Sequence, residues 1–291
     1  MTMLEPRSLF IDLGHSRRHV AAWGEPGAPV LLLQHGMRDH ARSWDWIARH
    51  FSHRYYVIAP DLRGHGDSDW SPDEAYALSD YVIDLADVVE ALGLPTLNLL
   101  GHSLGGHISL RFAAAFPEKI NRLAIIEAIE LPIIRDQRKH AVPHAARLRQ
   151  WIDNQRQRRA RSPRYYATLD EAAARMAEQN PDIDPVTIAH IARHSLIAEA
   201  GKGLRWKYDN ACRFRAPEDA HGLCLDEVLD AVTCPTLLAY GDASWISVPA
   251  AERLNRLRNH QLVIFPDAGH WLHHQAREPF LTALDSFLAD L

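Results

Sequence analysis

The sequence predicts an α/β protein with a mainly parallel sheet that helices cover on both faces. Short apolar runs rich in Val, Ile and Leu alternate with segments of helical periodicity, as in strand–helix–strand units. Hydrophobic residues make up 47% and charged residues 24% of the chain, which is the composition of a globular protein. The length of 291 residues suits one large domain or a domain that carries an insertion.

The expected strands lie in the first half of the chain and return near its end. A leading hairpin is predicted at 8–13 and 18–23, and buried strands are predicted at 30–34, 55–60, 96–101, 122–127, 236–241 and 261–266. Ser79 is expected to cap a helix whose apolar positions recur at helical spacing from Tyr81 to Leu92. Further helices are expected over 249–258 and 277–290.

Between the two groups of strands, the sequence is helical in character and lacks strong strand candidates. It predicts a helical cap insertion at 129–230, the cap segment, in a core domain formed by 1–128 and 231–291. Residues 135–164 within it carry ten basic side chains against two acidic ones. A solvated helix face is the ordinary explanation, and a cap that attracts anionic substrates or an acidic partner is the alternative.

Charge and composition exclude several classes of function. The net charge of −5 gives the chain no general attraction to nucleic acid or to an anionic membrane. No apolar run resembles a signal peptide or approaches the length of a membrane span, so we expect a cytoplasmic protein. The three cysteines form no C-x-x-C pair and are expected to be reduced thiols. No metal site is expected, and the pairs His190/His194 and His273/His274 are predicted to lie on exposed helix faces.

The most specific motif is Gly101-His102-Ser103-Leu104-Gly105, a G-x-S-x-G between an expected strand and an expected helix. A strand that turns directly into a helix strains the backbone at the serine and leaves no room for side chains at the flanking glycines. Ser103 would then present its hydroxyl at the sheet edge, beside a helix N-terminus that favours negative charge. The motif predicts a nucleophilic serine.

A nucleophilic serine needs a base for its proton and donors for the developing oxyanion. His270 lies in Gly269-His270-Trp271 after the last expected strand, where its side chain can reach back over the sheet edge. Gln34-His35-Gly36-Met37 follows another strand, so the backbone N–H groups of Met37 and Leu104 can supply the two donors. Gly36 is explained by a close approach of the backbone.

With these residues in view, the chain resembles the α/β-hydrolase fold enzymes, in particular the capped branch of epoxide hydrolases and dehalogenases. The resemblance rests on His35-Gly36, on the run from Asp61 to Ser68, on the elbow at Ser103 and on Gly269-His270-Trp271. It implies an α/β-hydrolase fold with a cap, no cofactor, and a structural role for the run from Asp61 to Ser68. Dehalogenases and epoxide hydrolases of this fold use an Asp nucleophile, so Ser103 disfavours both activities.

The acid that orients His270 has two candidates. In most of the enzymes that the chain resembles, this acid lies three residues beyond the glycine that ends the strand at 236–241, but here that position is Ser244. Asp242 lies one residue after Gly241, too early on the strand to reach the histidine without rearrangement, and is the alternative acid. Glu127 follows an earlier strand, as in dehalogenase-like members, and its longer side chain spans the extra distance. We therefore predict Glu127 as the acid.

The expected chemistry is hydrolysis of a carboxylic ester of a small molecule through an acyl-enzyme, without a cofactor. A carbon–carbon bond hydrolase or a lactonase would use the same triad on another bond. A non-catalytic ligand-binding member of the fold would be expected to have lost part of the triad. The sequence also leaves a homo-oligomer open. Aromatic side chains of the cap are expected either to line a largely apolar pocket or to pack in the cap: Trp151, Tyr165, Tyr166, Trp206 and Tyr208.

Overall fold

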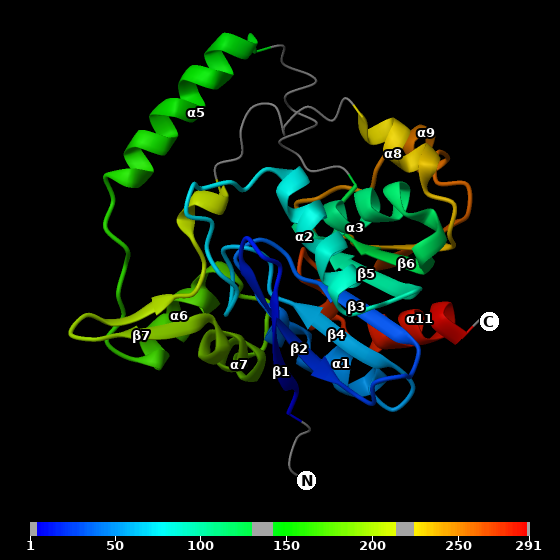
Figure 1. Cartoon of the computed structure of the whole chain (residues 1–291), viewed down its shortest axis with the longest axis horizontal. Helices are drawn as coiled ribbons and strands as arrows, with labels where there is room; N and C mark the ends of the chain where they lie inside the picture. Colours follow the sequence, from blue (N-terminus) through cyan, green and yellow to red (C-terminus); the bar gives the residue numbers. More distant parts are fainter. Residues whose placement is uncertain (1–4, 130–141, 214–223, 290–291) are drawn as a thin grey trace.

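The computed structural model describes residues 5–129, 142–213 and 224–289. An eight-stranded sheet forms its centre, in the order β1-β2-β4-β3-β5-β6-β9-β10 (Figure 1). β1 pairs antiparallel with β2 and β2 with β4, and all other neighbours are parallel. Every strand expected from the sequence is confirmed, with small shifts at the ends: β1 (Arg7–Asp12), β2 (Arg17–Trp23), β3 (Val30–Gln34), β4 (Tyr56–Pro60), β5 (Leu97–His102), β6 (Ile120–Ile126), β9 (Thr236–Gly241) and β10 (His260–Phe265).

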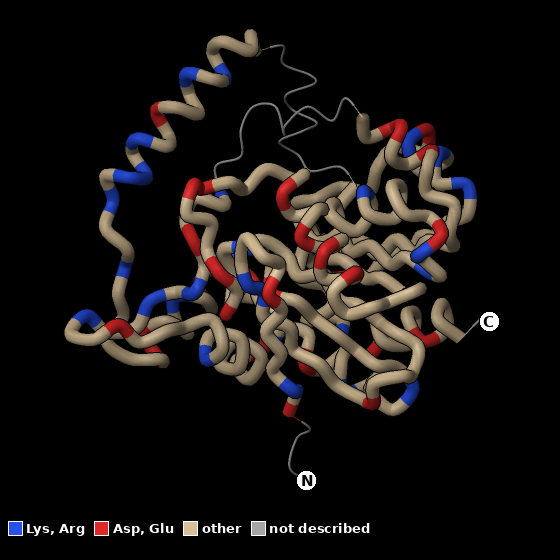
Figure 2. The backbone as a smooth tube through the Cα atoms, in the orientation of Figure 1, with Lys and Arg blue, Asp and Glu red and all other residues tan. Residues whose placement is uncertain are grey.

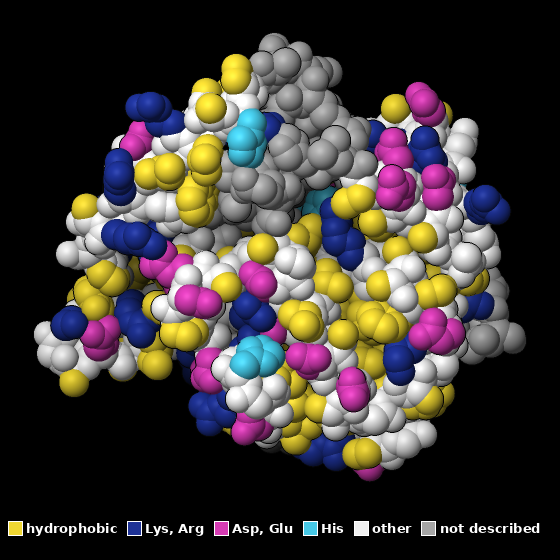
Figure 3. Space-filling model, turned by 45° about the horizontal axis from the view of Figure 1, so that its top comes forward, with side chains coloured by type: hydrophobic (Ala, Val, Ile, Leu, Met, Phe, Trp, Pro, Cys, Tyr) yellow, Lys and Arg dark blue, Asp and Glu magenta, His cyan; other side chains and the backbone are white. Residues whose placement is uncertain are grey.

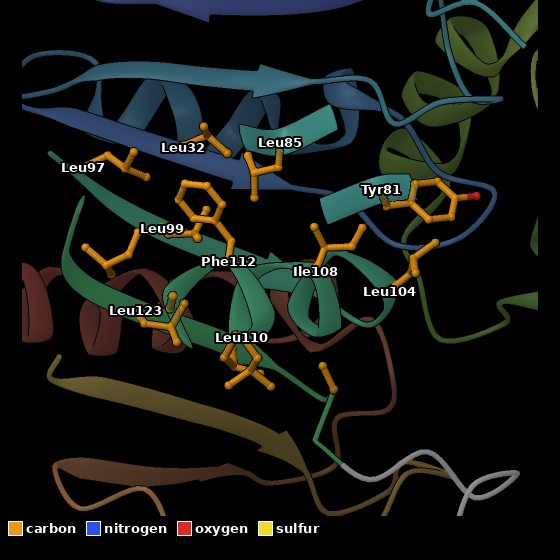
Figure 4. Close-up of a cluster of buried hydrophobic side chains, with 14 of the residues drawn as sticks. Leu32, Tyr81, Leu85, Leu97, Leu99, Leu104, Ile108, Leu110, Phe112 and Leu123 are labelled. Atoms are coloured by element: carbon orange, nitrogen blue, oxygen red, sulfur yellow. The ribbon is translucent and has the colours of Figure 1, made fainter. Parts of the chain in front are cut away.

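Helices cover both faces of this sheet, and each face has its own buried apolar cluster. Leu104, Ile108 and Phe112 of α3 belong to the first cluster and pack with α2 and the strands (Figure 4). That face is covered by α2 (Leu78–Ala91), α3 (Leu104–Ala115), α8 (Leu225–Ala231) and α9 (Ala251–Leu254). The other face is covered by α1 (Asp45–Phe51), α10 (Leu272–Gln275) and α11 (Arg277–Ala289), and short 3₁₀ turns lie at η1 (Ala41–Trp44), η2 (Pro117–Lys119) and η3 (Asn210–Arg213).

The start of α2 differs from the expectation. The helix begins at Leu78 with Ala77 as its N-cap, so Ser79 is not the cap and lies exposed within the first turn. The side chain that bonds at the helix start is Asp80 and not Ser79. The Asp80 carboxylate accepts a 2.7 Å hydrogen bond from the backbone N–H of Ala77. A carboxylate in the first turn also interacts favourably with the helix dipole.

The cap segment contains a hairpin that the sequence analysis did not anticipate. Its strands, β7 (Leu196–Glu199) and β8 (Gly203–Trp206), have four residues each, too few to show an alternating pattern. Gly201 and Gly203 adopt positive φ angles of 75° and 105° at the turn, which glycine tolerates without strain. The hairpin accompanies three helices: α5 (His144–Arg159), α6 (Leu169–Gln179) and α7 (Pro185–Ser195).

The last helix of the cap segment belongs with the sheet. Leu225 and Leu229 of α8 lie in the buried cluster that also contains Phe112 of α3. Helix α8 therefore packs against the sheet, although it lies within the range 129–230 that the sequence assigned to the cap. The division of the chain into core and cap otherwise stays a prediction.

Part of the basic segment at 135–164 lies outside the described residues. In the described part, Arg side chains recur along α5, which has no buried residue (Figure 2). Arg158 and Arg159 at its end both pair with Glu74 in the loop before α2. None of the helices in the described part of the chain has the length and apolar character needed to cross a bilayer.

Candidate active site

Ser103 occupies the sharp turn between β5 and α3. Its backbone angles are φ 52° and ψ −114°, a strained conformation for a residue with a side chain. The flanking glycines leave no space for a Cβ atom, which would lie 2.5 Å from the Gly105 carbonyl oxygen at Gly101 and 2.2 Å from the Gln34 carbonyl oxygen at Gly105. The strain and the crowding expected from the motif are both present.

The loop after β3 lies against this turn. A Cβ atom at Gly36 would lie 2.8 Å from His102 Nδ1 and 3.4 Å from Ser103 Cβ, so the backbone does approach closely there. His35 Nδ1 bonds to the Gly36 carbonyl oxygen at 2.7 Å, and its Nε2 accepts from the Leu62 backbone N–H at 3.0 Å. Burial lowers the pKa of His35 to about 4, so the neutral ring can donate at one nitrogen and accept at the other. The ring thereby fixes the backbone that precedes Met37.

Glu127 follows β6 directly and reaches His270. Its side chain is fully buried and its backbone has a φ of 47°, another positive value at a residue other than glycine. Oε2 accepts a 2.8 Å hydrogen bond from His270 Nδ1, and Oε1 accepts one of 2.8 Å from the Gly241 backbone N–H at the end of β9. With the His270 proton held on Nδ1, Nε2 remains an acceptor.

Ser244 is a site residue that the sequence analysis did not assign. Its Oγ donates a 2.6 Å hydrogen bond to Glu127 Oε2, and it accepts one of 3.1 Å from the Ile246 backbone N–H. The sequence did give one signal for Ser244, because it lies at the position where the enzymes that the chain resembles carry the acid. Asp242 instead is exposed, and its Oδ1 accepts from the Asp267 backbone N–H at 2.7 Å. The structure thus brings Glu127, the predicted acid, to His270 and places the alternative elsewhere.

A cavity of about 1320 Å3 lies between this edge of the sheet and the cap segment. Ser103 and His270 line it together with Met37 and Leu104, the two residues predicted to donate to the oxyanion. Trp245 also faces it, with its ring 4.9 Å from that of His270. Four of the predicted cap aromatics contribute, Tyr165, Tyr166, Trp206 and Tyr208, whereas Trp151 is outside the described lining.

The wall of the cavity is mixed, because basic side chains lie among the aromatic ones. Several Arg side chains of the cap segment line the cavity, among them Arg161, Arg164 and Arg205. In the space-filling view, Lys and Arg side chains recur along the cap side of the molecule (Figure 3). Tyr165, Tyr166, Trp206 and Tyr208 line the cavity as the sequence allowed, and basic side chains between them form part of the wall.

The histidine pairs are not on exposed faces as expected. His273 and His274 are buried, and the His273 ring stacks on Trp44 at 4.9 Å, because the short α10 packs against the sheet. His190 is half-buried on α7, and its Nε2 bonds to the Arg42 carbonyl oxygen at 3.1 Å. In the described structure, His190 thus contacts the core from the cap segment, whereas His273 packs within the core.

One group of residues in the described chain has the spacing of metal ligands: His19, Asp61 and Asp67. Both ring nitrogens of His19 are engaged, Nδ1 with Asp61 at 2.7 Å and Nε2 with Ser8 at 2.8 Å. Asp61 also accepts from the backbone N–H groups of Ala41 and Asp67, at 2.7 and 2.9 Å. These bonds fit the structural role expected for the loop, and we assign no metal to it.

Known proteins resemble this chain in sequence and in fold. A 2-(acetamidomethylene)succinate hydrolase of Mesorhizobium japonicum is 27% identical over 282 residues, 96% of this chain and 94% of that protein. The crystal structure of E-2-(acetamidomethylene)succinate hydrolase superimposes with a TM-score of 0.80 at 24% identity, covering 98% of this chain and 99% of the other. An esterase of Mycobacterium tuberculosis superimposes with a TM-score of 0.76 at 22% identity, covering 98% and 93%. At these identities the structures show the fold alone.

Other curated relatives match only in part. Mouse epoxide hydrolase 4 is 40% identical over 111 residues, which are 38% of this chain and 31% of that protein. An uncharacterized Mycobacterium tuberculosis protein is 37% identical over 100 residues, 29% of its length. The chain thus aligns with less than a third of these two proteins. The sequence profile described as alpha/beta hydrolase fold, however, matches residues 29–276, and the chain belongs to that family.

Proposed function

We propose that this hydrolase-family protein is a serine hydrolase that cleaves carboxylic esters through an acyl-enzyme. The observation that carries the proposal is the buried Glu127–His270 hydrogen bond of 2.8 Å, in a cavity that also contains Ser103 on its strained turn. A histidine held by a carboxylate through Nδ1 is oriented to act as a base at Nε2. The arrangement gives each step of acyl transfer a protein group.

In the proposed mechanism, Ser103 Oγ attacks the acyl carbon while His270 Nε2 accepts its proton. The carbonyl electron pair moves to the oxygen, which the backbone N–H groups of Met37 and Leu104 stabilise. When the tetrahedral intermediate collapses, His270 returns the proton to the departing alcohol and the acyl group remains on Ser103. His270 then removes a proton from water, which attacks the acyl carbon. When this second intermediate collapses, the bond from the acyl carbon to Ser103 Oγ breaks, His270 returns the proton to Oγ, and the carboxylic acid leaves. Glu127 stabilises the imidazolium that forms in both halves of the cycle.

The same catalytic groups could also cleave bonds other than a carboxylic ester. The Mesorhizobium japonicum relative, aligned over 96% of this chain, is named as a hydrolase of an acetamido compound, which favours amide hydrolysis as the second candidate. A carbon–carbon bond hydrolase and a lactonase stay alternatives on the same triad. A non-catalytic binding protein is disfavoured because Ser103, His270 and a buried carboxylate are all present.

The test is a panel of 4-nitrophenyl esters of increasing acyl length, run beside 4-nitroacetanilide and a γ-lactone. Ser103→Ala should lower kcat for the best substrate by several orders of magnitude, because the hydroxyl forms the new bond. Ser79→Ala, at an exposed serine on α2, is the matched control and should stay within about twofold of wild type. A Ser103→Ala enzyme with more than about a tenth of wild-type kcat would refute the proposal.

A further inference from the structure

The wall of the cavity above Ser103 carries an excess of positive charge. Among its described residues, Lys202 and Arg205 bind Glu199, at 2.6 and 3.0 Å. Arg158 pairs with Glu74, and Arg175 pairs with Glu178 at 2.6 Å. Four further arginines of the lining form no ion pair with a described carboxylate: Arg38, Arg161, Arg164 and Arg213.

The acidic residues of the lining offset only part of this positive charge. Glu199 is occupied by its two basic partners and by the hydroxyl of Tyr165 at 2.8 Å. Asp209 accepts from the Tyr76 hydroxyl at 2.7 Å and from a backbone N–H in its own turn. Asp39 is buried, which raises its pKa to about 7, so that it carries only part of a charge at neutral pH. The cavity therefore favours an anionic ligand.

Two of these four arginines, Arg38 and Arg213, line the cavity together with Tyr208. Burial raises the pKa of the Tyr208 hydroxyl, and the nearby guanidinium charges of Arg38 and Arg213 oppose this rise. Arg38 belongs to the core loop after β3, whereas Tyr208 and Arg213 belong to the cap segment. These three residues, the Arg38 cluster, join the two sides of the cavity.

Arg38 is also the basic residue nearest in sequence to the reacting groups. It follows Met37, whose N–H is a proposed oxyanion donor, and its φ of 63° lies in the left-handed region that residues other than glycine rarely adopt. Strained backbone of this kind is concentrated at functional sites. Arg161 and Arg164 lie instead on the exposed connection after α5 and show no such link to the core loop.

We propose that the Arg38 cluster binds a carboxylate of the substrate, so that the enzyme acts on esters that carry a free carboxylate away from the scissile bond. This inference depends on the proposed function of Ser103. The planar guanidinium presents paired N–H donors that match the two oxygens of a carboxylate, and Tyr208 adds a neutral donor. The anchor therefore consists of three specific residues, and it does not arise from the general charge of the segment at 135–164.

The experiment compares three substrates with one leaving group: 4-nitrophenyl monosuccinate, 4-nitrophenyl pentanoate and 4-nitrophenyl 4-aminobutanoate. In wild type, kcat/KM should be at least about 10-fold higher for the anionic ester than for the neutral one, and lowest for the cationic one. Raising the salt concentration from 0.05 to 0.5 M should reduce the anionic preference. Equal kcat/KM values for the anionic and neutral esters at low salt would overturn the inference.

Variants locate the preference within the cavity. Arg38→Gln and Arg213→Gln should each lower the anionic-to-neutral ratio by about 10-fold, with Arg38→Lys keeping more of it. Arg149→Gln, at an exposed arginine of α5 outside the lining, should change the ratio by less than about twofold. An equal loss in Arg149→Gln or Arg164→Gln would assign the preference to diffuse charge and contradict the Arg38 cluster.

Two further measurements separate the possible failures. Succinate should inhibit wild type competitively, and its inhibition constant should rise about 10-fold in Arg38→Gln, which reports the site without turnover. If succinate inhibits equally in both proteins, the Arg38 cluster is not the anchor. If Ser103→Ala still hydrolyses the esters, the proposed function itself is refuted. If Ser103→Ala is inactive but wild type shows no preference for the anionic ester, only this inference is refuted.

Discussion

Ser244 donates a 2.6 Å hydrogen bond from its Oγ to Glu127 Oε2, the same oxygen that accepts from His270 Nδ1. The two residues come from loops after different strands, β6 and β9, which are neighbours in the sheet. A hydroxyl therefore stands where most related enzymes place the acid, and it supports the carboxylate supplied by the neighbouring strand. Charge-assisted bonds of this kind hold a carboxylate in one orientation.

Replacing each candidate acid by its amide separates their contributions. Glu127→Gln keeps the shape but removes the charge that stabilises the His270 imidazolium, so kcat should fall by at least about 10²-fold. Asp242→Asn alters an exposed group bonded to the Asp267 backbone, and kcat should fall by less than about 10-fold. Steady-state kinetics on a 4-nitrophenyl ester, with matched melting temperatures as the folding control, decides between them. The reverse order would move the acid to Asp242.

A second-site substitution tests the arrangement of the two loops. In the Glu127→Gln background, Ser244→Asp should recover at least about 10-fold in kcat, because it returns a carboxylate to the neighbourhood of His270. Ser244→Ala alone should lower kcat by about 3- to 10-fold, since it removes one hydrogen bond to the charged group. Absence of any recovery in a double variant that melts like wild type would show that a carboxylate at 244 cannot orient His270.

The loop that carries Met37 tolerates no added atom. Gly36→Ala would place a Cβ atom 2.8 Å from His102 Nδ1, which forces the loop or the elbow to move. Displacement of an oxyanion donor acts on the transition state, so kcat should fall by about 10- to 100-fold with a smaller change in KM. Kinetics at saturating ester measures the effect. An unchanged kcat would argue against Met37 as a donor.

Buried histidines should make the fold sensitive to mild acid. Burial lowers the pKa of His35 and His40 to about 4 and that of His65 and His274 to about 3, below the ordinary value of 6.5. The unfolded chain then binds more protons, so this stability is complete above pH 6.5 and is lost as the pH falls toward 4. Asp39, with its pKa raised to about 7, acts in the opposite direction but is a single group.

Urea unfolding at pH 7.5, 6.5 and 5.5 measures this effect. Each excess proton on the unfolded chain lowers the free energy of unfolding by about 1.4 kcal/mol per pH unit. His53→Gln, at an exposed histidine, should keep the wild-type pH dependence, whereas His274→Gln should weaken it. A stability that is equal or greater at pH 5.5 would contradict the buried neutral state of these rings.

The sheet and the elbow could be predicted from the sequence because local patterns determine them. Apolar runs mark the buried strands of a parallel sheet, and the glycines around Ser103 reflect crowding within a few residues of the chain. Glu127 and His270 lie 143 positions apart. His270 was predicted from its place after the last strand, and Glu127 from the resemblance to dehalogenase-like enzymes, whose acid also follows this earlier strand. Topology rather than local propensity brings them together.

The sequence predictions failed at residues whose structure depends on contacts with distant parts of the chain. Four-residue strands such as β7 and β8 carry too little pattern, and they form because the turn and the cap around them allow pairing. His273 and His274 are polar in sequence but pack as aromatic rings against the sheet. Ser244 bonds to Glu127, which lies on a loop after another strand, and no local spacing reveals this contact.

The central claim is that Ser103 is a nucleophile activated by His270. The most direct measurement is intact-protein mass spectrometry after treatment with a fluorophosphonate, followed by peptide mapping. The folded wild-type protein should gain one phosphonyl group, mapped to Ser103, while Ser103→Ala should gain none and Ser79→Ala should be labelled like wild type. A folded wild-type protein that takes up no label, or a Ser103→Ala protein that is labelled as fast as wild type, would contradict the claim.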